Sequence, residues 1–290
     1  MGLRTKFNLM LLVAAVVGLV LFALAATPVL RGLARDQVLQ DSRLMMEAAS
    51  GARSYTSAEI APLLAPTQDV AFHPQAVSAY AAKKTLAGLH TDLPNYSYRE
   101  AALNPTNLDD KAADWEADII NDFRDHPEKQ EAVVERQTPE GASLVLAHPL
   151  VAKAACLVCH SVPSAAPETM IAIYGSQNGF GWKENEVIGA QIVSVPMTVP
   201  LAAAGHARLL LLATFAGVFV LLFALLNLLL GFTVIEPINR MAKTAEAVSL
   251  GKMDAPEYVQ PGADQIAKLS GAINRLRRSL QEALHMLSDE

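Results

Sequence analysis

Hydrophobic residues are concentrated in two long uncharged segments of this 290-residue chain. The first segment runs from Asn8 to Ala26, and the second runs for 27 residues from Leu209 to Ile235. A helix needs about 20 apolar residues to cross the hydrocarbon core of a bilayer. The pattern therefore predicts two transmembrane helices, at residues 8–26 and 209–235.

The first segment also has features of a cleaved signal peptide. Arg4 and Lys6 give it a basic start, and Ala23-Leu24-Ala25 could serve as a cleavage site. Its apolar stretch, however, is longer than the roughly 7–15 residues of a signal-peptide core. We therefore predict an uncleaved anchor.

Basic residues at the outer ends of the two spans predict their orientation. Residues 1–7 form a cytoplasmic N-terminus, residues 28–207 a periplasmic domain, and residues 236–286 a cytoplasmic domain. Arg31 and Arg35, just beyond the first span, oppose this assignment. The prediction is a two-pass protein of the bacterial inner membrane.

The region between the spans shows helical patterns first and strand patterns later. Residues 107–123 predict a helix, with Trp115, Ile119, Ile120 and Phe123 on one face. Residues 132–137 and 142–151 flank the turn 138–141 and predict a hairpin, and residues 187–197 predict a buried strand. This order indicates an α+β domain.

A further helical pattern continues from the first span through residues 35–52. Val38, Met45, Ala49 and Ala52 fall on one face of it at helical spacing.

The tail after the second span contains two short amphipathic helical patterns. Apolar residues recur at Met241, Ala245 and Val248, and again in heptad rhythm at Ile266, Leu269, Ile273, Leu276, Leu280 and Ala283. Glycines and prolines punctuate the connector. Two such helices cannot bury their seams alone, so we predict a homodimer with four helices.

The tail resembles a HAMP domain over about residues 234–280. Pro237, Gly251-Lys252-Met253 and Asp264-Gln265-Ile266 carry the resemblance, although many members have Glu at the position of Gln265. The resemblance implies that the tail passes a conformational signal, which we expect a separate cytoplasmic signalling protein to receive. The alternative is a plain dimerising coiled coil.

Composition and charge favour a membrane protein and disfavour a nucleic-acid-binding one. Hydrophobic residues make up 52% of the chain and charged residues 18%, as expected for a protein in contact with a lipid membrane. Residues 28–207 hold 13 Lys and Arg against 21 Asp and Glu, a net charge of −8. An acidic domain is a poor partner for nucleic acid.

The two cysteines of the chain lie three positions apart, directly before a histidine. Cys156-Leu157-Val158-Cys159-His160 matches the C-x-x-C-H pattern of covalent haem attachment. Cys156 and Cys159 would form thioethers to one haem c, and His160 would be the proximal iron ligand. The predicted periplasmic location agrees with this chemistry. A zinc site, a redox dithiol or a simple disulfide are the alternatives.

The sixth iron ligand has several candidates. Met46 or Met45 is our first choice, because both lie on the helical stretch that continues from the first span; packing in a core is the alternative role. The other candidates are Met170, His73, His90, His126 and His148, and an open or water-filled sixth position is a further alternative.

Phe180 and Trp182 lie in a glycine-rich stretch, Asn178-Gly179-Phe180-Gly181-Trp182. This stretch lacks the Lys-Ser/Thr of a phosphate-binding P-loop. We therefore expect a tight turn in which Phe180 and Trp182 pack against the haem.

The external region resembles a family of membrane-anchored c-type haem proteins with a PAS-like sensory domain, once classified as a domain of unknown function. The motifs that carry the resemblance are Arg53-Ser54-Tyr55-Thr56, Asn104-Pro105-Thr106-Asn107, Trp115-Glu116, Cys156 to His160, Asn178 to Trp182 and Gly189 to Pro196. The resemblance implies a PAS-like haem pocket and a redox- or gas-sensing role. The sixth ligand is not carried over, and the two cysteines already used exclude a cysteine there.

These features favour a haem sensor that responds to redox state or a diatomic gas and acts through a HAMP domain. An electron carrier with a dimerising tail is one alternative. A haem peroxidase is another, although no distal Arg/His pair is recognisable, so we predict that the protein is not an enzyme.

Overall fold

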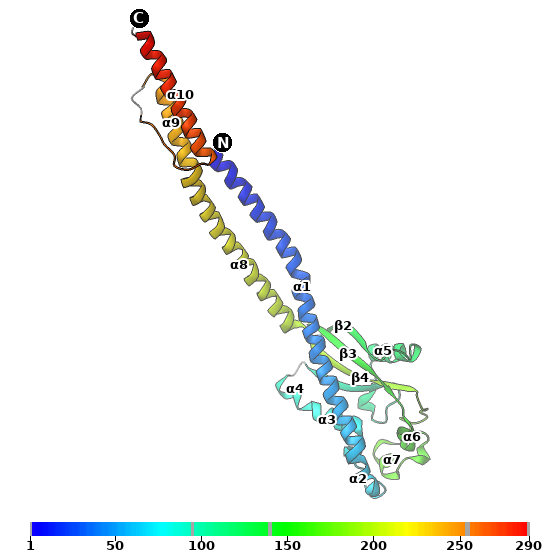
Figure 1. Cartoon of the computed structure of the whole chain (residues 1–290). Helices are drawn as coiled ribbons and strands as arrows, with labels where there is room; N and C mark the ends of the chain where they lie inside the picture. The colour runs from blue at the N-terminus through cyan, green and yellow to red at the C-terminus, as the bar shows by residue number, and fades with distance from the viewer. Residues whose placement is uncertain (1, 94–95, 139–140, 253–255, 289–290) are drawn as a thin grey trace. The chain divides into compact units, whose positions relative to one another are not determined.

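The computed structural model of the chain describes residues 2–93, 96–138, 141–252 and 256–288. The chain divides into two compact units, one of residues 27–207 and one of residues 1–26 together with 208–290. Figure 1 labels the elements of both units.

The fold mixes helices with one antiparallel sheet. The helices are α1 (Leu3–Tyr55), α2 (Ala61–Leu64), α3 (Ser78–Ala87), α4 (Leu89–Asp92), α5 (Asp114–Asp125), α6 (Ala154–His160), α7 (Glu168–Tyr174), α8 (Thr198–Leu230), α9 (Glu236–Ser249) and α10 (Gln265–Ser288). The strands are β1 (Ser97–Ala102), β2 (Ala132–Thr138), β3 (Gly141–Val151) and β4 (Val187–Pro196). The predicted combination of helices and an antiparallel sheet is confirmed.

The four strands lie in the order β1-β4-β3-β2, and every neighbouring pair is antiparallel. The predicted hairpin is β2 and β3, although residues 139–140 of its turn lie outside the described residues. The predicted buried strand is β4, which lies in the middle of the sheet. The pattern did not predict β1, because Arg99 and Glu100 interrupt its short apolar sequence.

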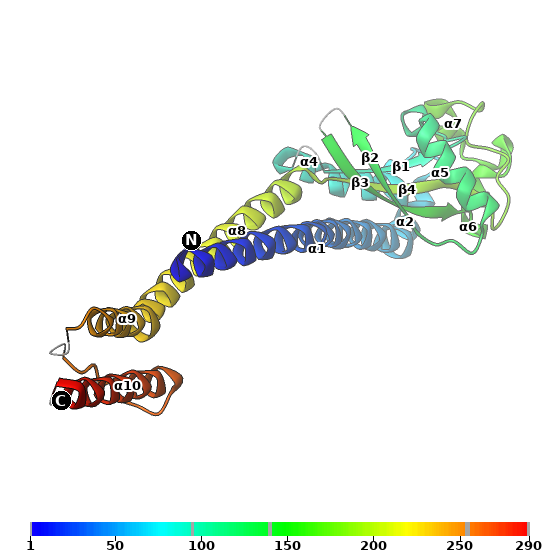
Figure 2. The same cartoon turned by 90° about the horizontal axis from the view of Figure 1, so that it is seen from above.

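Helices cover both faces of the sheet. On one face, α1 packs against Leu144, Leu146, Val193 and Val195 of the two central strands. On the other face, Ile119, Ile120 and Phe123 of α5 pack against residues that include Val145 and Ile192. Figure 2 shows α1 and α5 on opposite sides of the strands. A strand covered on both faces has a nearly continuous apolar sequence, as β4 does.

The face of α1 that packs on the sheet differs slightly from the prediction. Val38, Ser42, Met46 and Ala49 are wholly buried, whereas Met45 is half-buried beside them. The buried positions are four, four and three residues apart, as helical geometry requires. The apolar pattern passed over Ser42, whose hydroxyl donates to the carbonyl oxygen of Val38 at 2.8 Å.

The helix predicted at residues 107–123 begins later than expected. Leu108–Asp110 forms a single 3-10 turn, and the amide of Ala112 donates to the carbonyl oxygen of Ala102 at 2.9 Å. This contact keeps the chain extended beside β1. The α-helix then begins at Asp114, where the Glu116 carboxylate accepts a hydrogen bond from the Ala113 amide at 2.8 Å.

The other unit contains the apolar parts of α1 and α8. Phe22 and Phe215 stack with their ring centroids 4.8 Å apart, and Gly18 lies beside Phe219. Within the described ranges of the chain, two helices are long and apolar enough to cross a membrane. These are the helices that contain the two apolar segments of the sequence.

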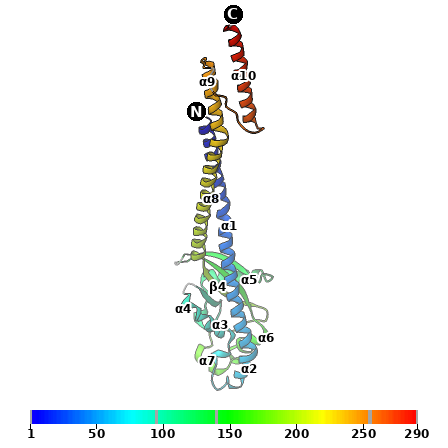
Figure 3. The same ribbon diagram turned by 60° about the vertical axis from the view of Figure 1, so that its left-hand side comes forward.

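In the same unit, α9 and α10 lie side by side (Figure 3). Met241 and Val248 of α9 are buried. The connector between α9 and α10 is held to α10 at Tyr258. The carbonyl oxygen of Tyr258 accepts hydrogen bonds from the Ser270 hydroxyl and, at 2.9 Å, from the side-chain nitrogen of Asn274.

Candidate functional site

Both cysteines lie on α6, a helix of two turns that follows β3. The Ala152 amide donates to the carbonyl oxygen of Glu186 at 2.9 Å, and Lys153 then precedes the first turn. Cys156 and Cys159 are free thiols, each half-buried. Residues three apart lie on the same side of a helix, so both cysteines lie on one side of α6.

The Cys159 thiol is not activated. Burial raises its pKa above the ordinary value, and the neighbouring Cys156 adds to the shift. Among the described residues, no group of three or more His, Cys, Asp and Glu could hold a metal ion. The lack of such a group among the described residues disfavours the zinc site, whereas the redox dithiol stays an alternative.

The ring of His160, at the end of α6, is held in one orientation. Its Nδ1 atom lies 2.7 Å from the carbonyl oxygen of Gly179, which can only accept, so we assign the proton to Nδ1. Burial lowers the pKa of His160, an effect that this hydrogen bond partly opposes. The imidazole is therefore neutral at pH 7, with the lone pair of Nε2 free to bind a metal.

The glycine-rich stretch predicted as a tight turn wraps around this histidine. The Trp182 ring stacks on the His160 ring with centroids 4.0 Å apart, and the Phe180 ring lies 6.4 Å away. The backbone is joined as well, because the Gly181 amide donates to the carbonyl oxygen of Ser161 at 3.0 Å. The structure thus brings Phe180 and Trp182 together with His160.

Asn104 ties the same loop to the turn that follows β1. Its side-chain oxygen accepts from the Gly179 amide at 3.0 Å, and its side-chain nitrogen donates to the carbonyl oxygen of Phe180 at 3.2 Å. The Thr106 hydroxyl lies 3.4 Å from Nδ1 of His160. The sequence marked Asn104 and Thr106 only as part of a family motif, and did not predict their contact with the loop.

Comparison with known protein families identifies the domain that contains this site. The Tll0287-like family model matches residues 31–196, more than half of the chain. The chain belongs to the Tll0287-like family. The matched range contains α6, His160 and the whole of the glycine-rich loop.

The comparisons add one solved structure for the Tll0287-like domain. The crystal structure of the cyanobacterial heme-protein Tll0287 is similar with 18% sequence identity and a TM-score of 0.35, over 57% of this chain and 91% of that chain. At this TM-score we draw no argument from the likeness. No curated protein matches the chain.

The structure places the candidate sixth ligands of the Tll0287-like domain in different surroundings. Met46 is buried and Met45 half-buried in the apolar cluster of α1, β3 and β4, whereas the described contacts of His160 are with Thr106, Gly179, Phe180 and Trp182. No residue of the apolar cluster around Met45 and Met46 is among the described contacts of His160. The methionine ligand therefore stays a prediction.

The remaining candidates are also accounted for. The imidazole of His126 lies 3.0 Å from the carbonyl oxygen of Asp122, and that of His148 lies 3.5 Å from the Glu131 carboxylate. Met170 is buried on α7, and His73 is half-buried, with its backbone amide donating to the side-chain oxygen of Gln68 at 3.2 Å. The side chain of His90 lies outside the described residues.

Gly179 is predicted to be the least replaceable glycine of the loop. Gly179 and Gly181 have nearly equal positive φ angles, 81° and 83°. A Cβ atom on Gly179 would meet Thr106, with its Cα 2.8 Å away, whereas one on Gly181 would meet nothing within 4 Å. Gly181→Ala should therefore cost about 1 kcal/mol of stability for its φ angle, and Gly179→Ala about 2 kcal/mol or more.

Gly181→Ala is the control for Gly179→Ala, because both variants carry the same free-energy penalty for a positive φ angle. Urea unfolding followed by circular dichroism would measure the difference. Equal losses at the two positions would contradict the close contact between Gly179 and Thr106.

Proposed function

We propose that the Tll0287-like domain binds one haem c covalently through Cys156 and Cys159, with His160 as the proximal iron ligand. The observation that carries this proposal is the hydrogen bond between Nδ1 of His160 and the carbonyl oxygen of Gly179. Metal-binding histidines characteristically donate their other ring N–H to such a group, which orients the ring.

The residues present fit a haem. The two half-buried thiols lie one turn apart on α6, directly before a neutral imidazole. Phe180 and Trp182 add flat apolar rings beside that imidazole. Membership of the Tll0287-like family agrees with the haem-protein resemblance of the sequence motifs.

We further propose that residues 8–26 and 209–235 anchor the protein in the inner membrane, with residues 28–207 in the periplasm. The length and composition of the two apolar helices support this location. The basic residues at their outer ends support the orientation.

For residues 236–286 we propose a dimeric HAMP domain. The pairing of α9 with α10 and the attachment of the connector at Tyr258 support it. So do the heptad leucines of α10, which a single chain leaves exposed: Leu269, Leu276 and Leu280 are 45%, 72% and 43% exposed. A second chain would bury them.

The function we propose is sensing of redox state or a diatomic gas in the periplasm, with the signal passed through the HAMP domain to a cytoplasmic partner. When bound, haem supplies an iron centre that can change oxidation state or take up a gas. Met45 and Met46 lie on α1, the same helix that contains the apolar segment 8–26. Loss or gain of iron ligation by one of these methionines would therefore act on the helix that enters the membrane. Almost complete switching would require the two states to differ by about 5.5 kcal/mol.

Optical and resonance Raman spectra of the purified full-length protein test this proposal. We expect a haem whose axial ligation differs between oxidised and reduced protein, or changes on addition of CO or NO. Two unchanged ligands in both states and no response to gas would instead indicate an electron carrier. Turnover of hydrogen peroxide would indicate an enzyme.

A further inference from the structure

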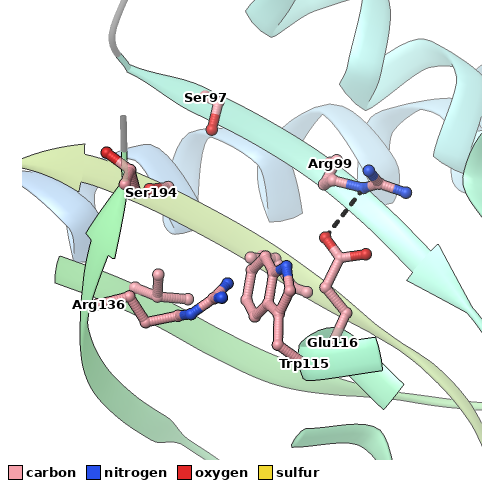
Figure 4. A pocket seen from close by; sticks show the side chains of 9 residues that line it. Ser97, Arg99, Trp115, Glu116, Arg136 and Ser194 are labelled. Atoms are coloured by element: carbon pink, nitrogen blue, oxygen red, sulfur yellow. Dashed lines mark ion pairs between the residues drawn. The ribbon is translucent and has the colours of Figure 1, made fainter. Parts of the chain in front are cut away.

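The sheet face that carries α5 is only partly covered by that helix. Near the N-terminal end of α5, the strands β1, β2, β3 and β4 and the helix line a partly open cavity of about 120 Å³. Figure 4 shows its lining side chains. The cavity lies wholly within the unit of residues 27–207 and is separate from the residues that surround His160.

Polar and apolar groups are segregated in this cavity. Val145 and Ile192, both buried, form an apolar floor on the two central strands. Ser97 and Ser194, which face each other across β1 and β4, add two hydroxyl groups. Such a combination of apolar floor and few polar groups is typical of small-molecule sites.

Arg99 brings a positive charge that is already balanced within the protein. Its Nε atom lies 3.2 Å from the buried carboxylate of Glu116, and it also donates to the carbonyl oxygen of Lys111 at 2.9 Å. Glu116 is 1% exposed and also accepts the Ala113 amide. This pair is therefore a fixed wall of the cavity.

Arg136 has a different environment. Its guanidinium lies over the Trp115 ring, 3.9 Å from the centroid, and Figure 4 shows its side chain pointing toward that ring. Within the described parts of the chain, no carboxylate is paired with Arg136. Stacking on an indole holds the guanidinium in place but leaves its N–H groups available to an anion.

The size and charge of the cavity select its ligand. A volume of about 120 Å³ has room for several water molecules and therefore for a small ligand. One unbalanced positive charge matches a single negative charge, and the apolar floor matches a short alkyl group. Phosphate, which is polar on every side, would leave that floor without a partner.

We propose that this cavity is a binding site for a short-chain monocarboxylate. The carboxylate is bound by Arg136 with the hydroxyl groups of Ser97 and Ser194, and the alkyl group packs on Val145 and Ile192. This site gives the domain a second ligand class, independent of any group bound at His160.

Calorimetric titration of the purified full-length protein with propionate, in a chloride buffer, tests the site. The wild-type protein should bind propionate, and Arg136→Gln should weaken binding about tenfold or more, because it removes a charge-assisted hydrogen bond. Lys84→Gln is the matched control, since Lys84 also lies over an aromatic ring, that of Tyr80, but outside the cavity. That variant should bind as the wild type does.

Ser194→Ala is a second variant, which removes one hydroxyl from the proposed site and should also weaken propionate binding. It tests the site even if Arg136→Gln does not fold. The proposal is overturned if wild-type protein does not bind propionate at millimolar concentration, or if both cavity variants bind it unchanged. Tighter binding of inorganic phosphate than of propionate would overturn the assigned ligand class.

Discussion

Replacing Cys156 and Cys159 together by serine is expected to abolish covalent attachment of haem, so that none remains on the denatured polypeptide. Each thioether requires a sulfur atom, and these are the two cysteines of the whole sequence. No other thiol can take over their role. Haem staining after denaturing electrophoresis, together with the pyridine haemochrome spectrum, measures the loss.

Ser161→Ala is the matched control, since Ser161 directly follows α6 and supplies its backbone carbonyl, not its side chain, to Gly181. It should retain haem at the wild-type level. Each single cysteine variant should keep one thioether and show a haemochrome spectrum between those of two-thioether and non-covalent haem. A haem-stained band from the double variant would disprove attachment at this motif.

Replacing His160 by alanine should have the second-largest effect, because it removes the proposed proximal ligand while leaving both thiols in place. Covalent haem should persist, but the optical spectrum should lose the features of the wild-type axial ligation. Added imidazole should restore them in part, since it can occupy the space left by the side chain. The measurement is the Soret and visible spectrum with increasing imidazole.

The control for this variant is His126→Ala, which removes an exposed histidine that contacts its own helix at Asp122. Its spectrum should equal that of the wild type. If His160→Ala also had an unchanged spectrum, another residue would be the proximal ligand and the hydrogen bond from Nδ1 to Gly179 would have a purely structural role.

The strands of the sheet show which elements can be predicted from the periodicity of apolar residues. The strands β2, β3 and β4 follow from alternating or continuous apolar residues and a turn, all of which are local in the sequence. The strand β1 does not, because Arg99 and Glu100 form ion pairs with residues distant in sequence. Arg99 pairs with Glu116, and Glu100 pairs with Arg53 and accepts from the Tyr98 hydroxyl.

The same distinction applies to α1 and α5. Helical spacing predicted that Val38, Met45, Ala49 and Ala52 share one face of a helix, and the structure buries Val38 and Met46 of this helix against the sheet. Whether Met45 or Met46 lies fully in the core depends on how the sheet meets the helix, including at the polar Ser42. The start of α5 at Asp114 likewise depends on the pairing of Ala112 with Ala102 of β1.

The sequence by itself determined what depends on neighbouring residues: two apolar segments, a hairpin, heptads in the tail, and two thiols and an imidazole within one C-x-x-C-H motif. Only the tertiary structure decided how these groups are oriented, buried and hydrogen-bonded. The carbonyl that orients His160 lies 19 residues away, and Asn104, which holds that carbonyl's loop, lies 75 residues from Gly179. The cavity beside Arg136 takes its walls from four strands and a helix. Contacts of this kind follow from the packing of the whole domain, because burial and hydrogen bonding depend on which distant segments meet.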